Sequence, residues 1–137
     1  MLREAGRFED RRGAAAVEFA LVGPLMILLL VAIITYGGWF LTAHAVQSLA
    51  SEGARAAIAG LDLAERRDLA RQAIDEAVVD AGLEPARVTV GATAETDRVR
   101  VQVAYDMTGH PLMQLGGMLP SPPRVIRRSA VIRVDPE

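Results

Sequence analysis

The sequence contains no cysteine, which excludes a disulfide framework and any thiolate metal site. It also contains no lysine, so all 15 basic residues are arginines. We attribute this bias first to the codon composition of the gene and only second to a chemical requirement for arginine. Aromatic residues make up only 4% of a chain that is 51% hydrophobic, so alanine, valine and leucine must fill its core. The net charge of −2 provides no general attraction to nucleic acid, and we expect no nucleic-acid partner. A chain of 137 residues holds one small domain besides any membrane segment.

Residue patterns that carry catalysis are equally scarce. The two histidines, His44 and His110, lie far apart in the sequence, whereas a zinc site needs three or four ligands. The sequence has no HExxH motif, no phosphate-binding glycine loop and no Ser/His/Asp arrangement beyond chance. We therefore expect structural roles for both histidines, and neither enzyme activity, a cofactor nor a bound metal.

One long stretch, Phe19 to Ala43, carries no charged side chain. At 1.5 Å per residue, its roughly 25 residues form a helix of about 37 Å, enough to cross a bilayer core of about 30 Å. Four arginines precede this stretch and the first one after it is Arg55, so the N-terminus should stay in the cytoplasm and the remainder should be exported. Pro24 lies inside the segment and predicts a kink in the helix.

A single carboxylate, Glu18, lies at the front edge of this segment, five residues after Gly13. An acidic side chain is costly in hydrocarbon, so its presence there indicates a function. If the chain were cut after Gly13, Ala14 would carry a free amine with a pKa near 7.7–8.0, which is largely cationic. Glu18 lies one helical turn further on the same face and can pair with that ammonium or with the ammonium of a neighbouring subunit. We therefore interpret Glu18 as a residue that sets register during assembly; a carboxylate that merely stabilises the helix start is the alternative.

The segment from Gly13 to Leu25, with the sequence GAAAVEFALVGPL, resembles the N-terminus of TadE-like pilus assembly proteins. These are pseudopilins or minor pilins of the tight-adherence machinery, and they share the processing site of the type IV pilin superfamily. The resemblance implies cleavage by a prepilin peptidase, with Gly13, Ala14, Glu18 and Phe19 as the processing site, and a role in building a Flp-type pilus. The implied partners are that peptidase, other pilin and pseudopilin subunits, and the inner-membrane assembly platform. Ala14 departs from the aromatic or methionine that many type IV pilins carry after the cut, which excludes an N-methylated aromatic first residue.

We divide the chain into a cytoplasmic basic leader at 1–13, a transmembrane helix at 14–45 and a periplasmic head at 46–137. The first helix should continue into the head as far as Gly60, with one face formed by Val46, Leu49, Gly53, Ala57 and Ile58. Asp62 is the expected N-cap of a second helix, with Glu65 as its capping-box partner and Gly82 as its stop. Alternating residues then predict a hairpin that turns at 95–97 and a third strand at 125–134. The expected fold is a pilin-like α+β head in which one further helix packs on a three-stranded antiparallel sheet.

The loop between the last two strands is unusually apolar. We considered two roles for it, a short helix that covers the open side of the sheet and an exposed contact surface for another pilus subunit. Strand arginines likewise suggest either an ordinary solvated face or a contact with an acidic partner or polysaccharide. The possible partner-contact residues of the loop are Leu112, Met113, Leu115, Met118 and Leu119, and the strand arginines are Arg98, Arg100, Arg127 and Arg133.

The function expected from the sequence is that of a minor pilin or pseudopilin in the bacterial inner membrane, acting in pilus assembly, adhesion or surface attachment. Whether it enters the filament, caps it or stays at its base is left open. One alternative is a soluble periplasmic binding domain released by a signal peptidase at Ala43-His44-Ala45, with a cut before Val46. The other is an uncut single-pass adaptor of a secretion system. The three hypotheses predict mature proteins that begin at Ala14, Val46 and Met1, respectively.

Overall fold

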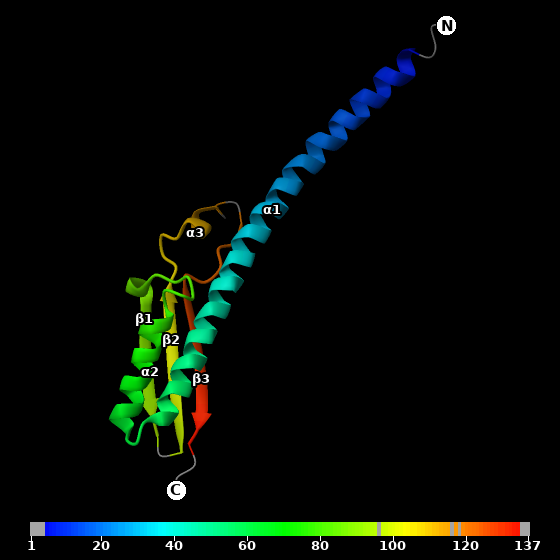
Figure 1. Ribbon diagram of the computed structural model, residues 1–137. Coiled ribbons are helices and arrows are strands. Elements are labelled where there is room, and N and C mark those ends of the chain that lie inside the picture. The colour runs from blue at the N-terminus through cyan, green and yellow to red at the C-terminus, as the bar shows by residue number, and fades with distance from the viewer. Residues whose placement is uncertain (1–4, 96, 116, 118, 135–137) are drawn as a thin grey trace.

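The computed structural model describes residues 5–95, 97–115, 117 and 119–134, with side chains from Gly13 onward. Its dominant element is one long helix, α1 (Ala5–Ala56), which a short 3₁₀ turn at Ala57–Ala59 extends to Gly60. The helix projects far beyond the rest of the molecule at its N-terminal end and packs on the sheet at its C-terminal end (Figure 1). The expected continuation of the first helix into the head is therefore confirmed.

The second helix, α2 (Leu63–Ala77), begins after Asp62 as its sequence predicts, but the α-helix ends at Ala77 and turns carry the chain on to the expected stop at Gly82. The Asp62 carboxylate accepts hydrogen bonds from the backbone N–H groups of Ala64 and Glu65, both at 2.8 Å. Glu65 closes the capping arrangement by accepting the N–H of Leu61 at 2.7 Å, one residue before the cap itself. At the other end Gly82 adopts a φ of 71°, and the next N–H reaches back to Val78 at 3.1 Å. Such a left-handed glycine satisfies the last carbonyls of a helix and turns the chain away.

The sheet has three antiparallel strands in the order β1 (Val88–Ala94), β2 (Arg98–Asp106) and β3 (Val125–Arg133). In β2 every second side chain is buried, and Val101 at its centre lies opposite Ala92 of β1 and Ala130 of β3. This alternation places one apolar face against the helices and leaves one polar face outside. The fold class expected from the sequence is confirmed.

The core lies between this apolar face and the two helices, which cover the same side of the sheet (Figure 1). Gly53 lets the helices approach closely, because a Cβ atom there would lie only 2.7 Å from Cδ1 of Ile74 on α2. One expected core residue is placed wrongly by the sequence pattern: Ile58 is 50% exposed, because the helix tightens into its 3₁₀ turn at that point. The buried residues of α1 are Ala43, Val46, Leu49, Ala50, Ala54 and, in the turn, Ala57.

The outer face of the sheet stays exposed to solvent. The loop after β2 does form a short helix, α3 (Pro111–Leu115), but this helix lies beside α1 and not over the sheet as one expectation had it. Arg98 on this face pairs with Asp97 at 2.9 Å and Glu95 at 3.3 Å, and its hydrogen bond lowers the pKa of the Asp97 carboxyl. The other outward arginines of the strands are also exposed; they are Arg100, Arg127 and Arg133.

Candidate functional site

The N-terminal half of α1 does not pack against the head. Its large apolar side chains are exposed, from Val17 at 62% and Phe19 at 77% to Ile33 at 59%. The helix is long and apolar enough to cross a membrane, with a mean hydropathy of 2.7 over its most apolar window. An uncovered apolar helix of this length requires lipid or other helices around it. The chain is therefore membrane-anchored through α1.

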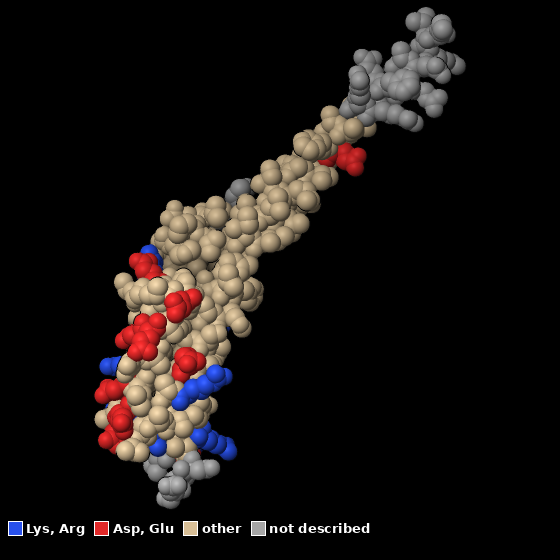
Figure 2. All heavy atoms as spheres, in the orientation of Figure 1, with Lys and Arg blue, Asp and Glu red and all other residues tan. Residues whose placement is uncertain are grey.

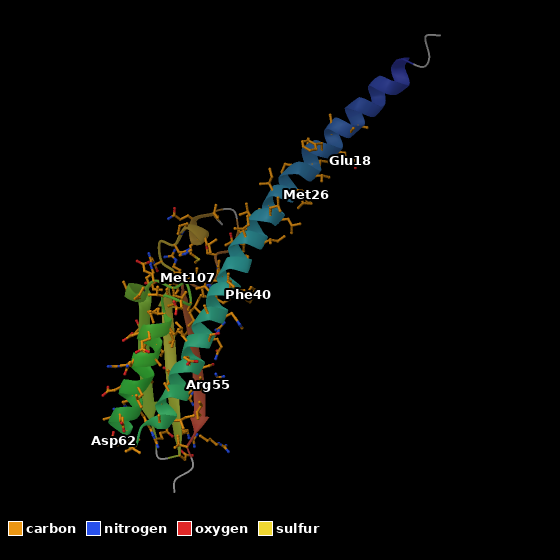
Figure 3. All side chains as sticks on the ribbon, in the orientation of Figure 1. Glu18, Met26, Phe40, Arg55, Asp62 and Met107 are labelled. Carbon is orange, nitrogen blue, oxygen red and sulfur yellow. The ribbon has the colours of Figure 1, made fainter. Side chains whose placement is uncertain are left out.

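Glu18 is the one acidic group that interrupts this apolar surface (Figure 2, Figure 3). Its side chain is exposed, and no described residue forms an ion pair with it. Gly13 and Ala14 lie one turn earlier on the same continuous helix, also exposed, and a Cβ atom at Gly13 would have no described atom within 4 Å. The structure thus holds the four residues of the expected processing site together on one open stretch of helix, away from the head.

Pro24 lies within this stretch, and α1 continues through it as a single helix. Proline has no N–H, so the carbonyl four residues earlier, that of Ala20, loses its usual donor. The kink expected at Pro24 stays a prediction.

The loop that follows β2 is hydrogen-bonded to α1 at the level where the helix meets the head. The Tyr36 hydroxyl donates a hydrogen bond to the carbonyl of Pro120 at 2.5 Å, and Nε1 of Trp39 donates to the carbonyl of Pro123 at 2.9 Å. Trp39 also packs edge-to-face on Phe40, with ring centroids 5.3 Å apart. We refer to these two bonds, with the Leu112–Gly38 contact described next, as the loop clamp. Sequence reasoning missed it; the available signal was a pair of aromatic donors on a membrane helix and a proline-rich loop with unpaired carbonyls.

Gly38 makes the third contact of the clamp possible. A Cβ atom there would lie 2.5 Å from Cδ1 of Leu112, so with any larger residue this side chain would have to shift from its present place on the helix. Gly37 faces open space, since a Cβ atom at that residue would have no described atom within 4 Å. The neighbouring glycines are therefore not equivalent, and only Gly38 serves the packing that a small residue permits.

The expected partner-contact residues separate into two groups. Leu112 and Met113 are half-buried against the core, and Leu119 is also half-buried, so these three side chains have little surface to offer a partner. Leu115 is 54% exposed. Met118 falls outside the described residues.

His110 has a structural position at the start of α3. Its Nδ1 accepts the backbone N–H of Leu112 at 3.3 Å, and its carbonyl accepts the N–H of Met113 at 2.9 Å. His44 is an exposed residue of α1. Among the described residues, no three His, Asp or Glu side chains come together as a metal site.

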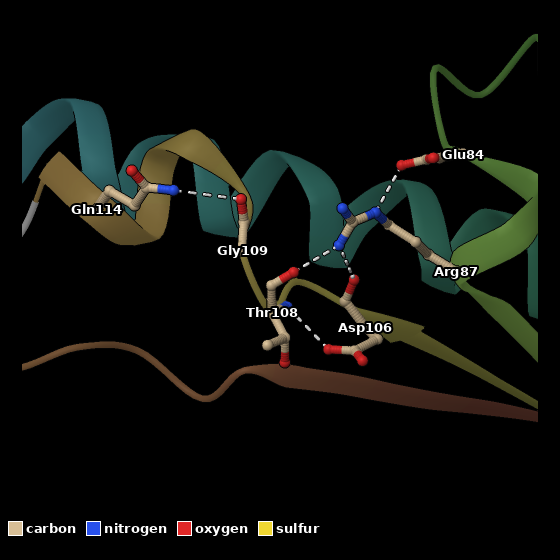
Figure 4. A network of polar contacts seen from close by, with 6 residues as sticks. All are labelled: Glu84, Arg87, Asp106, Thr108, Gly109 and Gln114. Atoms are coloured by element: carbon tan, nitrogen blue, oxygen red, sulfur yellow. Dashed lines mark hydrogen bonds and ion pairs between the residues drawn. The ribbon is translucent and has the colours of Figure 1, made fainter.

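A polar network fixes the start of the loop to the sheet (Figure 4). The Arg87 guanidinium donates to the carbonyls of Thr108 at 2.6 Å and Asp106 at 3.3 Å, and it pairs with Glu84, which raises its pKa. The Asp106 carboxylate accepts the N–H of Thr108 at 2.8 Å, and this bond holds the pKa of the carboxyl below its usual range. Gly109 then adopts a φ of 75°, which turns the chain towards α1.

Residues 13–55 match the family model of TadE-like proteins. The resemblance predicted from the sequence is thereby confirmed over this segment. The match covers the free apolar half of α1, the residues of the loop clamp that belong to α1, and the part of α1 that packs in the core. No curated protein and no solved structure matches the chain at a significant level. The TadE-like segment indicates a role in tight-adherence pilus assembly and interaction with other pilus components.

Proposed function

We propose that this chain is a minor pilin or pseudopilin of a tight-adherence pilus machine. In this proposal a prepilin peptidase cuts between Gly13 and Ala14, α1 spans the inner membrane, and the α+β head lies in the periplasm. The observation that carries the proposal is the TadE-like match at 13–55, which begins at the expected cleavage residue and contains Glu18 on an uncovered apolar helix.

Cleavage would change the chemistry at the start of α1. In the intact chain the nitrogen of Ala14 is an amide inside the helix, and cutting after Gly13 converts it to an ammonium. Glu18 then lies about 6 Å further along the helix axis, within reach of a new cation. Because no described residue pairs with this carboxylate, it is available to the ammonium of its own chain or of a neighbour. An unpaired carboxylate at membrane depth is costly, so subunits that align the two charges are favoured over subunits that do not.

The position of Gly13 also supports processing. A peptide bond inside a helix is held by backbone hydrogen bonds and must be exposed locally before a peptidase can reach it. Glycine weakens a helix by about 0.5–1 kcal/mol relative to alanine, which makes that opening easier. Gly13 is exposed, and a Cβ atom there would have no described atom within 4 Å, so no described side chain covers that side of the residue.

The structure disfavours release by a signal peptidase before Val46. Ala43 and Val46 are 3% and 0% exposed, and the helix runs through both without a break. A cut there would divide the core helix and remove Tyr36, Gly38 and Trp39, the residues of α1 that hold the loop clamp.

The first experiment is intact-mass and N-terminal analysis of the protein from native membranes, in the wild type and in two matched variants. Gly13→Leu should leave the leader attached, whereas Gly37→Leu, at another exposed glycine of the same helix, should be processed normally. A wild-type protein that begins at Met1 or Val46 would refute the proposal.

The register role of Glu18 is tested separately. Glu18→Gln should still be processed and inserted but should lose pilus assembly, measured as filaments in the sheared fraction. Glu52→Gln, an exposed carboxylate of α1 in the head, should assemble like the wild type. Normal assembly by Glu18→Gln would remove the register role.

A further inference from the structure

The loop at the base of the head, where the head meets the free half of α1, is itself uncharged, and Arg87, Asp106 and Arg124 lie at its two ends. From Met107 to Pro123 the sequence has no Asp, Glu, Lys or Arg, although charged residues are frequent in the rest of the head. On the face shown in Figure 2, the described surface between the charged side chains of the head and Glu18 is uncharged. The uncharged loop is thus continuous with the apolar surface of the membrane helix.

The loop also lies at the depth where the membrane should end. Starting from Glu18, a hydrocarbon core of about 30 Å accommodates about 20 residues of helix and ends near Gly38. This is the residue on which Leu112 rests. Tyr36 and Trp39 flank the same level, as aromatic residues do at a membrane–water interface.

The hydrogen bonds of the loop suit such a position. Backbone carbonyls without donors are costly where water is scarce. Pro120 and Pro123 lie outside any helix, so their carbonyls have no helical donor. They accept hydrogen bonds instead from the Tyr36 hydroxyl and from Nε1 of Trp39 on α1. On the outer side Leu115 remains 54% exposed, with Pro111 and Gln114 of α3 also exposed. A half-exposed leucine on an uncharged, internally bonded loop beside a membrane helix is suited to contact lipid.

We propose that the described residues of this loop, 107–115, 117 and 119–123, form a membrane foot that rests in the interface of the outer leaflet with Leu115 inserted among the acyl chains. This inference depends on the proposed placement of α1 in the membrane and extends it. The loop clamp ties the foot to α1, so helix and foot together give the head two attachments to one bilayer. Two attachments restrict how the head tilts and turns about α1, and they present α2 and the sheet to neighbouring subunits in one orientation.

The experiment uses the full chain in lipid nanodiscs of phosphatidylethanolamine and phosphatidylglycerol. The sequence has no cysteine and one tryptophan, so a fluorophore can be attached at Leu115→Cys while Trp39 reports on α1 in the same molecule. Leu61→Cys is the matched control, because Leu61 is a 91% exposed leucine next to Asp62, which lies at the end of the head opposite the loop (Figure 3). Lipids that carry a nitroxide high on the acyl chain quench any fluorophore that reaches them.

The foot predicts that the label at residue 115 emits at shorter wavelength than the label at residue 61 and loses most of its emission to the nitroxide lipids, as Trp39 does. Quenching of Trp39 with an unquenched label at residue 115 would overturn the foot and leave α1 in the membrane. Disulfide formation between two unlabelled copies of Leu115→Cys on addition of an oxidant, together with protection of the labelled protein from the lipid quencher, would identify a second copy as the occupant and would also overturn the foot. If Trp39 itself escapes quenching, the placement of α1 fails and the foot fails with it.

Discussion

Replacing Gly38 by alanine should loosen the loop clamp, while the same change at Gly37 should not. The new Cβ would lie 2.5 Å from Cδ1 of Leu112, and ordinary contact begins at 3.4 Å, so the leucine must move away from α1. Full burial of a leucine contributes about 1.5–3 kcal/mol, and Leu112 is half-buried, so its displacement should cost about 1 kcal/mol. Both variants gain the same helix preference of alanine over glycine, about 1 kcal/mol, so their difference isolates the clamp.

Amide hydrogen exchange measures this difference directly. The Met113 N–H, which donates to the carbonyl of His110 at 2.9 Å, reports on α3. A loss of about 1 kcal/mol in local stability accelerates exchange about fivefold. We expect this acceleration across residues 107–115 in Gly38→Ala and unchanged exchange there in Gly37→Ala. Equal exchange of the loop in the two variants would show that the Leu112 contact does not hold it on α1.

Three further changes test the packing and electrostatics of the head. Gly53→Ala should lower the stability by about 1 kcal/mol, or about 4–8 °C in Tm, because overpacking against Ile74 outweighs the gain in helix preference. Asp62→Ala should cost about 1 kcal/mol through loss of the N-cap of α2, seen as a lower Tm by circular dichroism. The pKa of Asp106 is lowered by its bonds with Thr108, so its contribution is complete above the unfolded pKa of about 3.9 and is lost as the pH falls through the folded value. Acid should therefore lower the Tm of the wild type more than that of Asp106→Asn.

The elements of the head could be predicted because each depends on local residue patterns. The cap at Asp62, the left-handed glycine at Gly82 and the alternation in β2 are set by neighbours in sequence, and the structure contains all three. The exposed position of Ile58 was not predictable by the same reasoning. Helical periodicity assumes 3.6 residues per turn, and the helix changes to a 3₁₀ turn just before this residue.

The proposed processing site depends on residues that are neighbours in the sequence, whereas the loop clamp joins residues that are far apart in it. Gly13 and Glu18 lie five residues apart on one helix that projects beyond the head, so recognising them requires no knowledge of long-range packing. The clamp joins Tyr36 to Pro120 and Trp39 to Pro123, pairs that are 84 residues apart in the chain. Their meeting depends on how far β3 extends and on the side of α1 that the sheet covers. The clamp therefore follows from the packing of the whole head, and mutations in the head that shift α1 against the sheet should disturb the membrane-proximal loop without touching it.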